Sequence, residues 1–284
     1  MESFTAITKT IDAMREAKVL KTTDDIRRKT NDAKVILVAA HRTGSSFTAY
    51  FLNHIRKWRL AVEGSDTLKD ACKQSVGCST LTPEQLSESC DTFKHVAMKV
   101  IRLDSLTLLE SLVVEDRMNL KVLHLVRDPR GVASSRKRFY GYTEKKPLVD
   151  SMNTYCQSTV EKLEFSSNIP DWLKGRYKRI RYEDIAIDPL KTAKIIYHFI
   201  NLPLPSIVTD WISANTKQDN INSMSKMSTH KNSTAAAQSW RSRLLYDDVE
   251  EIQSLTQCHK LMDMMNYYAI DSPTQMTNLS FVTF

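Results

Sequence analysis

The chain has 284 residues, of which 42% are hydrophobic, enough to bury a full core in one large domain or two small ones. The net charge of +7 suits a polyanionic ligand, although a solvated basic surface gives the same balance. No basic block with interleaved aromatic residues indicates nucleic-acid binding. No apolar run approaches the roughly 18 residues of a membrane span, and the first residues lack a signal-peptide core, so this chain predicts no membrane contact.

No linker rich in glycine, proline or serine divides the chain. We therefore expect a polar lead-in at residues 1–33, one domain at residues 34–270 and a tail at residues 271–284. Short apolar runs with β-branched residues predict strands at residues 35–40, 59–63, 95–101, 121–126 and 176–181. Helical periodicity predicts helices at residues 47–58, 104–118, 135–139, 148–165, 189–200, 203–215 and 244–265.

The helix at residues 104–118 is expected to be capped by Asp104, and residues 219–236 are polar enough to predict a mobile loop. Strands that alternate with helices predict an α/β fold. Its expected form is a P-loop-like parallel sheet of about five strands with helices on both faces.

A tight turn, His41-Arg42-Thr43-Gly44-Ser45-Ser46, separates the first strand from the first helix. Such a turn directs unpaired backbone amides and the positive end of a helix dipole at one place, so it predicts an anion site, with phosphate as the expected anion. It occupies the position of a Walker loop but lacks the G-x-x-x-x-G-K-[ST] pattern. The alternative is an ordinary helix start that is capped by Ser45 and Ser46.

A second turn follows the strand at residues 121–126. Arg127 leaves that strand, and Ser135 lies eight residues later, so a helix that folds back can bring the hydroxyl near the guanidinium as a second phosphate clamp. The alternative is that Asp128 pairs with Arg127 or Arg130 and only caps the helix. Two anion sites at neighbouring strand ends indicate one ligand with two separated anionic groups.

Both turns resemble motifs of a known family. Arg42-Thr43-Gly44-Ser45-Ser46-Phe47 is similar to the 5′-phosphosulfate loop of sulfotransferases, and the spacing from Arg127 to Ser135 is similar to their 3′-phosphate motif. The chain most resembles carbohydrate sulfotransferases of the galactose, N-acetylglucosamine and N-acetylgalactosamine 6-O type. The further similarities lie at residues 181–184, 188–190, 201–204, 211–212 and 239–241, so that the resemblance covers about residues 34–268.

This resemblance implies transfer of a sulfuryl group from 3′-phosphoadenosine 5′-phosphosulfate (PAPS) to a glycan hydroxyl, expected to be a 6-hydroxyl, without a metal. The residues that it assigns to the donor are Arg42, Thr43, Gly44, Ser45, Ser46, Phe47, Arg127, Ser135 and Tyr182. Arg42 also suits catalysis, because charge grows on the leaving phosphate oxygen. Tyr182 resembles a tyrosine that approaches the adenine, and a core tyrosine is the equal alternative.

A general base must take the acceptor proton, and Glu63 is expected to do so. Similar enzymes carry a glutamate at this point, although Gly64 stands where they generally have proline. The alternative for Glu63 is a solvent-facing strand end. His41 and His124 are weaker candidates, because one precedes the turn and the other is expected to pack on a strand.

Three other functions stay open. A P-loop kinase would need a Walker lysine and Mg²⁺ ligands, which the sequence lacks. A catalytically silent nucleotide- or glycan-binding protein, or a sulfotransferase for small alcohols or phenols, would keep the same fold. The sequence sets neither the acceptor sugar nor an oligomeric state.

The resembled family works in the Golgi lumen behind an N-terminal anchor, and residues 1–32 contain no such anchor. The cysteines form no C-x-x-C pair, so zinc binding and thioredoxin chemistry are not expected. They are either buried thiols of a cytosolic protein or two disulfides and a free thiol of a secretory one, and the sequence leaves both open. They are Cys72, Cys78, Cys90, Cys156 and Cys258.

Overall fold

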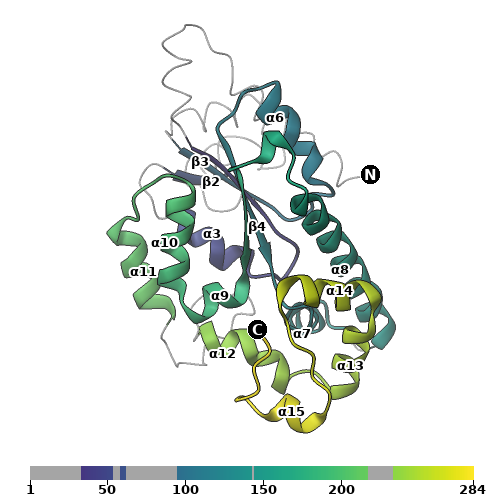
Figure 1. Cartoon of the computed structure of the whole chain (residues 1–284). Helices are drawn as coiled ribbons and strands as arrows, with labels where there is room; N and C mark the ends of the chain where they lie inside the picture. The colour runs from purple at the N-terminus through teal and green to yellow at the C-terminus, as the bar shows by residue number, and fades with distance from the viewer. Residues whose placement is uncertain (1–32, 54–57, 62–94, 143, 217–232) are drawn as a thin grey trace, which may run out of the picture.

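The fold is an α/β sheet structure, seen in a computed structural model that describes residues 33–53, 58–61, 95–142, 144–216 and 233–284 (Figure 1). Its five strands are β1 (Lys34–Val38), β2 (Trp58–Ala61), β3 (His95–Val100), β4 (Leu120–Val126) and β5 (Tyr177–Arg181). All neighbouring pairs are parallel, and their order is β2-β3-β1-β4-β5. Strands therefore occur at each predicted position, and the expected parallel sheet is confirmed.

Helices connect and cover these strands. The α-helices are α3 (Ser45–Asn53), α6 (Glu110–Val114), α7 (Pro129–Tyr140), α8 (Lys145–Ser167), α9 (Tyr182–Ile187), α10 (Pro189–Phe199), α11 (Ser206–Thr216), α12 (Ser233–Gln238), α13 (Tyr246–Ser254), α14 (Thr256–Met265) and α15 (Pro273–Thr277). The 3₁₀ helices are η2 (Leu106–Leu109), η3 (Asp171–Leu173) and η4 (Ser239–Ser242).

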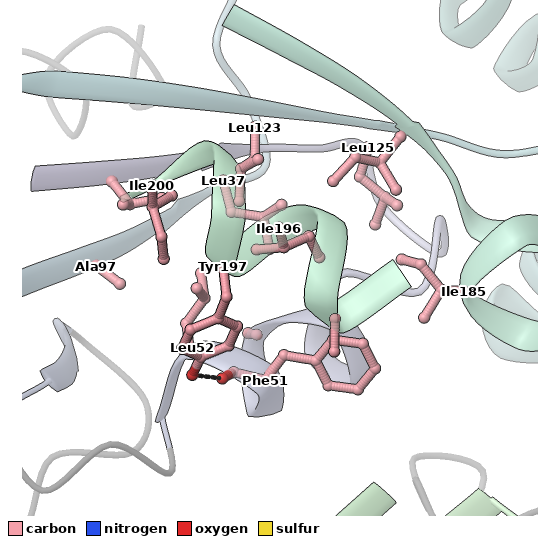
Figure 2. Packing of buried hydrophobic residues seen from close by; sticks show 14 of the residues in the cluster. Leu37, Phe51, Leu52, Ala97, Leu123, Leu125, Ile185, Ile196, Tyr197 and Ile200 are labelled. Atoms are coloured by element: carbon pink, nitrogen blue, oxygen red, sulfur yellow. Dashed lines mark hydrogen bonds between the residues drawn. The ribbon is translucent and has the colours of Figure 1, made fainter. Parts of the chain in front are cut away.

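One face of the sheet is covered by α3, α9, α10 and α11. Successive strand residues point to opposite faces, and Leu37 and Leu123 point to this one. They pack against Ile196 of α10 and Phe51 of α3 (Figure 2). The hydroxyl of Tyr197 donates a hydrogen bond of 2.7 Å to the backbone oxygen of Phe51, which ties α10 to the end of α3.

The other face carries η2, α6 and η3. Ile36 and Val122 of the sheet pack there against Leu106, Leu112 and Leu173, all of which are buried. Helices therefore cover both faces, as the sequence predicts for a parallel sheet.

A third apolar cluster lies beyond the carboxyl ends of the strands and joins α7, α8, α13 and α14. Val132, Met152 and Ile252 are fully buried in it. A disulfide between Cys156 of α8 and Cys258 of α14 crosses it, with 4.9 Å between the two Cα atoms. The disulfide joins positions 102 residues apart, so it binds the C-terminal helices to the middle of the chain.

Five sequence expectations need correction. Trp58, which the periodicity assigns to the end of the first helix, belongs to β2, and α3 spans Ser45–Asn53.

The next three concern helix boundaries. Ser105 rather than Asp104 caps the helical segment after β3, since its side chain accepts from the Thr107 amide. The expected closing helix is two helices, because Leu255 adopts extended dihedrals between α13 and α14. The helix expected from residue 203 begins at Ser206, after two prolines.

The last correction concerns the expected loop at residues 219–236. Residues 233–236 of that stretch belong to α12. The Ser233 hydroxyl donates a hydrogen bond of 2.5 Å to the backbone oxygen of Ala186, which holds the start of α12 on α9. The rest of the predicted loop lies outside the described residues, as does the lead-in at residues 1–32.

Candidate active site at two strand-to-helix turns

The turn after β1 contains two residues with positive φ. Arg42 has a φ of 71° and Gly44 a φ of 89°, both in the left-handed region. Between them Thr43 is buried, and its hydroxyl donates a hydrogen bond of 2.8 Å to the backbone oxygen of Ala40. Helix α3 then begins at Ser45, so its first-turn amides have no partner within the helix. The turn can therefore offer several amides to one anion.

The turn after β4 is closed by Asp128. Its carboxylate accepts a hydrogen bond of 2.9 Å from the Arg130 amide, and Pro129 occupies the first position of α7. The same carboxylate forms an ion pair of 2.7 Å with the Arg130 guanidinium, and both side chains are buried. The guanidinium stacks 4.5 Å from the centre of the Trp240 ring. Asp128 thus caps the helix and pairs with Arg130, one of the two partners that the alternative interpretation allowed.

Arg127 is left with a different set of contacts. Its backbone is fixed by the buried hydroxyl of Tyr155, which donates to the Arg127 oxygen at 2.7 Å. Its guanidinium lies 4.2 Å from the centre of the Tyr182 ring, and Nη1 donates to the Arg42 backbone oxygen at 3.0 Å. Nε is buried and has no hydrogen-bond partner among the described residues. Gly131 leaves room for it, since a β-carbon there would lie 2.9 Å from Nε.

The two turns meet at one point. The Nε of Arg42 donates a hydrogen bond of 2.9 Å to the Ser135 hydroxyl, 93 residues along the chain. This contact forms because β1 and β4 are parallel neighbours, which brings their carboxyl ends to the same edge of the sheet. The structure therefore places Arg42 in contact with both Ser135 and Arg127. The motif spacing predicts the Ser135 hydroxyl beside the Arg127 guanidinium, whereas this hydroxyl accepts its hydrogen bond from Arg42.

Two guanidinium groups share this point. Burial, followed by the charge of Arg127, lowers the pKa of Arg42, although a guanidinium stays protonated in proteins. An anion bound beside Arg42 and Arg127 would relieve their mutual repulsion. The arrangement is thus suited to a phosphate or sulfate group.

The remaining residues of the first turn differ in burial. Ser45 is buried at the start of α3, whereas Ser46 is exposed. Phe47 packs against Phe51 and Trp211, with ring centroids 5.5 and 5.9 Å apart. The side chain of Phe47 is therefore part of the packing.

Tyr182 connects the site to the core. Its ring is buried in the cluster beneath the sheet, and it also lies against Gly44 and under the Arg127 guanidinium. The core interpretation of Tyr182 fits this position, and its role at the adenine stays a prediction.

The histidine candidates have different surroundings. His124 is buried on β4, where its Nδ1 lies 2.8 Å from the Tyr177 hydroxyl, and burial lowers its pKa to about 3. The packing role expected for His124 fits this position. His41 is half-buried beside the first turn, and its Nδ1 lies 3.2 Å from the Tyr140 hydroxyl. Burial, followed by the charge of Arg102, lowers its pKa. Glu63, the expected base, lies outside the described residues.

Sequence reasoning missed Glu183 at this site. Its buried carboxyl accepts hydrogen bonds from the Asp128 amide at 3.1 Å and from the Tyr267 hydroxyl at 2.7 Å. Burial, followed by the charge of Asp128, raises its pKa to about 7. The sequence feature that could have identified it is its position two residues after β5, at the same edge of the sheet as the two turns.

Neither a metal centre nor a membrane span appears in the described ranges. They contain no group of three or more His, Cys, Asp or Glu side chains that could hold a metal ion. In the same ranges, no helix combines the length and apolar character that crossing a bilayer requires.

Comparisons with known proteins show the family and the fold. The family described as sulfotransferase domain matches residues 32–266. Carbohydrate sulfotransferase 1 of Danio rerio is 36% identical over 217 residues, which cover 72% of this chain and 51% of that protein. Carbohydrate sulfotransferase 3 of Mus musculus is 34% identical over 217 residues, which cover 72% and 45%. The chain thus spans about half the length of the curated relatives it matches.

A solved structure gives the same fold. The mouse sulfotransferase SULT7A1, complexed with PAP, superposes with a TM-score of 0.52 at 12% identity, covering 84% of this chain and 89% of that one.

Proposed function

Since the chain belongs to the sulfotransferase family, we propose that it transfers a sulfuryl group from PAPS to a carbohydrate hydroxyl. The observation that carries the proposal is the meeting of two anion-binding turns, at the 2.9 Å contact between Arg42 and Ser135. The relatives named carbohydrate sulfotransferase support a sugar acceptor. The mouse structure complexed with PAP supports a nucleotide donor.

The donor is proposed to span the two turns. Its 5′-phosphosulfate lies at the first-turn amides of α3, and its 3′-phosphate lies at Arg127 and Ser135. Arg127 fits this role because its Nε is buried without a partner among the described residues, whereas Arg130 is already paired with Asp128. An anionic phosphate oxygen would supply the missing hydrogen-bond acceptor.

The transfer itself is proposed to be in line. The acceptor oxygen forms a bond to sulfur while the bond from sulfur to the 5′-phosphate oxygen breaks. Charge grows on that leaving oxygen, and Arg42 with the α3 amides is placed to stabilise it, an effect worth about 10² to 10³ in rate per donor. The acceptor proton goes to a base, for which Glu63 remains our proposal.

A primary 6-hydroxyl and the Golgi lumen are the finer parts of the proposal. The hydroxyl position rests on the resemblance to the 6-O type alone. The compartment is supported by the disulfide between Cys156 and Cys258, because such bonds persist in oxidising compartments.

Labelled PAPS, offered with a panel of glycans and with simple phenols in the presence and absence of EDTA, tests the proposal. We expect label on glycans that carry a free 6-hydroxyl, at a rate that EDTA leaves unchanged. Arg42→Ala should lower kcat by about 10² to 10³. Glu63→Gln should lower it by about 10² to 10⁴.

Arg117→Ala is the matched control for Arg42→Ala. Arg117 is also an arginine with positive φ, at 51°, and it is exposed between α6 and β4. Its replacement should leave turnover unchanged. Binding of PAP without transfer to any acceptor would contradict the enzyme proposal, and transfer to phenols alone would contradict the carbohydrate acceptor.

A further inference from the structure

The end of α7 carries a group of aromatic side chains that the donor site does not use. Phe139 and Tyr140 lie in its last turn, and their ring centroids are 5.1 Å apart. Gly141 ends the helix with a φ of 68°, and the chain turns so that Tyr142 lies 5.5 Å from Tyr140, centroid to centroid. The three rings thus form one continuous aromatic surface.

This surface is exposed, unlike most aromatic side chains in the described residues. Phe139 is 39% exposed and Tyr140 is 44% exposed, whereas Tyr142 is half-buried. The other exposed large hydrophobic side chain that is aromatic in these ranges is Tyr268. Single exposed apolar residues are ordinary, but adjacent exposed rings beside a site indicate binding.

The aromatic surface adjoins the first anion-binding turn directly. The Arg42 guanidinium lies 4.6 Å from the centre of the Phe139 ring. The Tyr140 hydroxyl lies 3.2 Å from Nδ1 of His41. A molecule seated on Tyr140 is therefore a neighbour of the group that we propose to stabilise the leaving oxygen.

We propose that Tyr140 and Tyr142 form a subsite for a pyranose ring of the acceptor glycan. This inference rests on the proposed function and names the surface that would hold its acceptor. A pyranose ring presents C–H groups on one face and hydroxyls around its edge. The C–H face suits the negative face of an aromatic ring, so the rings of Tyr140 and Tyr142, rather than the Tyr140 hydroxyl that contacts His41, are the proposed binding surface.

Two variants at one position separate the ring from its hydroxyl. Tyr140→Phe keeps the ring, and Tyr140→Ala removes it. We expect Tyr140→Ala to raise the KM for a glycan acceptor about 3- to 10-fold and Tyr140→Phe to change it less than twofold. The KM for PAPS and the affinity for PAP by calorimetry should stay unchanged in both. Saccharide affinity of the PAP-loaded protein should fall by the same factor in Tyr140→Ala.

Tyr268→Ala is the control, because it removes an aromatic ring that is 57% exposed and outside the subsite. An unchanged acceptor KM in Tyr140→Ala, or an equal loss in Tyr268→Ala, would overturn the subsite. An equal loss in Tyr140→Phe would also overturn it, since the hydroxyl contact to His41 would then carry the effect. A loss of PAP affinity would assign the rings to the donor. Failure of the proposed function is visible separately, as wild-type protein that transfers to no saccharide.

Discussion

Gly44 lies against the ring of Tyr182 so closely that a β-carbon on residue 44 would fall 2.2 Å from Cδ2 of that ring. The glycine belongs to the turn after β1, and the tyrosine opens α9 at the end of β5. The turn that we propose for the phosphosulfate is therefore shaped by the residue that follows the edge strand β5. The same ring also supports the Arg127 guanidinium, so one side chain borders both turns.

Gly44→Ala should consequently disrupt donor binding. The new methyl group must displace the Tyr182 ring, and residue 44 must also hold a φ of 89°. We expect PAP affinity, measured by calorimetry, to fall at least tenfold. Gly141→Ala is the matched control, because Gly141 has a φ of 68° but a β-carbon there meets nothing within 4 Å. It should cost about 1 to 2 kcal/mol of stability and leave PAP affinity intact. Equal affinity loss in both variants would exclude the contact with Tyr182 as the cause.

The buried ion pair of Asp128 and Arg130 should stabilise the folded protein. Arg130 also donates 2.9 Å hydrogen bonds to the Gln253 side chain and to the Tyr268 backbone oxygen. Arg130→Ala leaves the Asp128 carboxylate buried and unpaired, so we expect a loss of about 3 to 5 kcal/mol in the free energy of unfolding by urea titration.

An exposed ion pair provides the comparison. Lys146 and Asp150 lie 2.9 Å apart with side chains that are 83% and 63% exposed. Lys146→Ala should therefore cost less than about 0.5 kcal/mol. A loss of similar size in both variants would contradict the structural role of Arg130.

The sequence predicts the strands and the two turns well, because the patterns that mark them lie within a few neighbouring residues. Apolar runs locate the strands. The Ser135 hydroxyl, expected beside Arg127, instead accepts from Arg42, which lies 93 residues away and gives no local signal. The choice between Arg127 and Arg130 as partner of Asp128 was left open, because it depends on Trp240 and Tyr268, more than 100 residues away.

The wrong sequence predictions also arise where local patterns do not decide the structure. Asp104 and Ser105 are both good capping residues, and only the backbone decides between them. The apolar residues keep a helical spacing through Leu255, so the sequence pattern does not show that the helix breaks there into α13 and α14. Glu183 was missed because its partners, the Asp128 amide and the Tyr267 hydroxyl, come from other parts of the chain.

The disulfide should contribute strongly to stability. It closes a loop of 102 residues between Cys156 and Cys258, and loop entropy assigns about 5 kcal/mol to a loop of that length. We expect Cys156→Ala to lower the free energy of unfolding by roughly 2 to 5 kcal/mol. Peptide mapping of the non-reduced wild type by mass spectrometry should recover Cys156 linked to Cys258. Recovery of both as free thiols from oxidising conditions would refute the bond and remove the support for a luminal compartment.

Glu183 should make stability depend on pH in a direction opposite to that of an ordinary ion-paired carboxylate. Its pKa is raised from 4.5 to about 7, first by burial and then by the charge of Asp128, whereas Arg127 and the Tyr267 hydroxyl act in the lowering direction. Between these two pH values the unfolded chain has lost the proton and the folded chain has kept it. The contribution of Glu183 is therefore fully present below about pH 4.5, declines as pH rises, and is level above about pH 7.

A difference measurement isolates this contribution, since other groups titrate in the same range. Glu183→Gln keeps an oxygen that can accept from the Asp128 amide but has no proton to release. We expect the stability of Glu183→Gln relative to wild type to increase by about 3 kcal/mol between pH 4.5 and pH 7 in urea titrations. Asp150→Asn is the control, because that carboxylate is 63% exposed and its variant should show no such trend. A constant difference between Glu183→Gln and wild type across this range would mean that the buried carboxyl ionises in the folded chain as it does in the unfolded one.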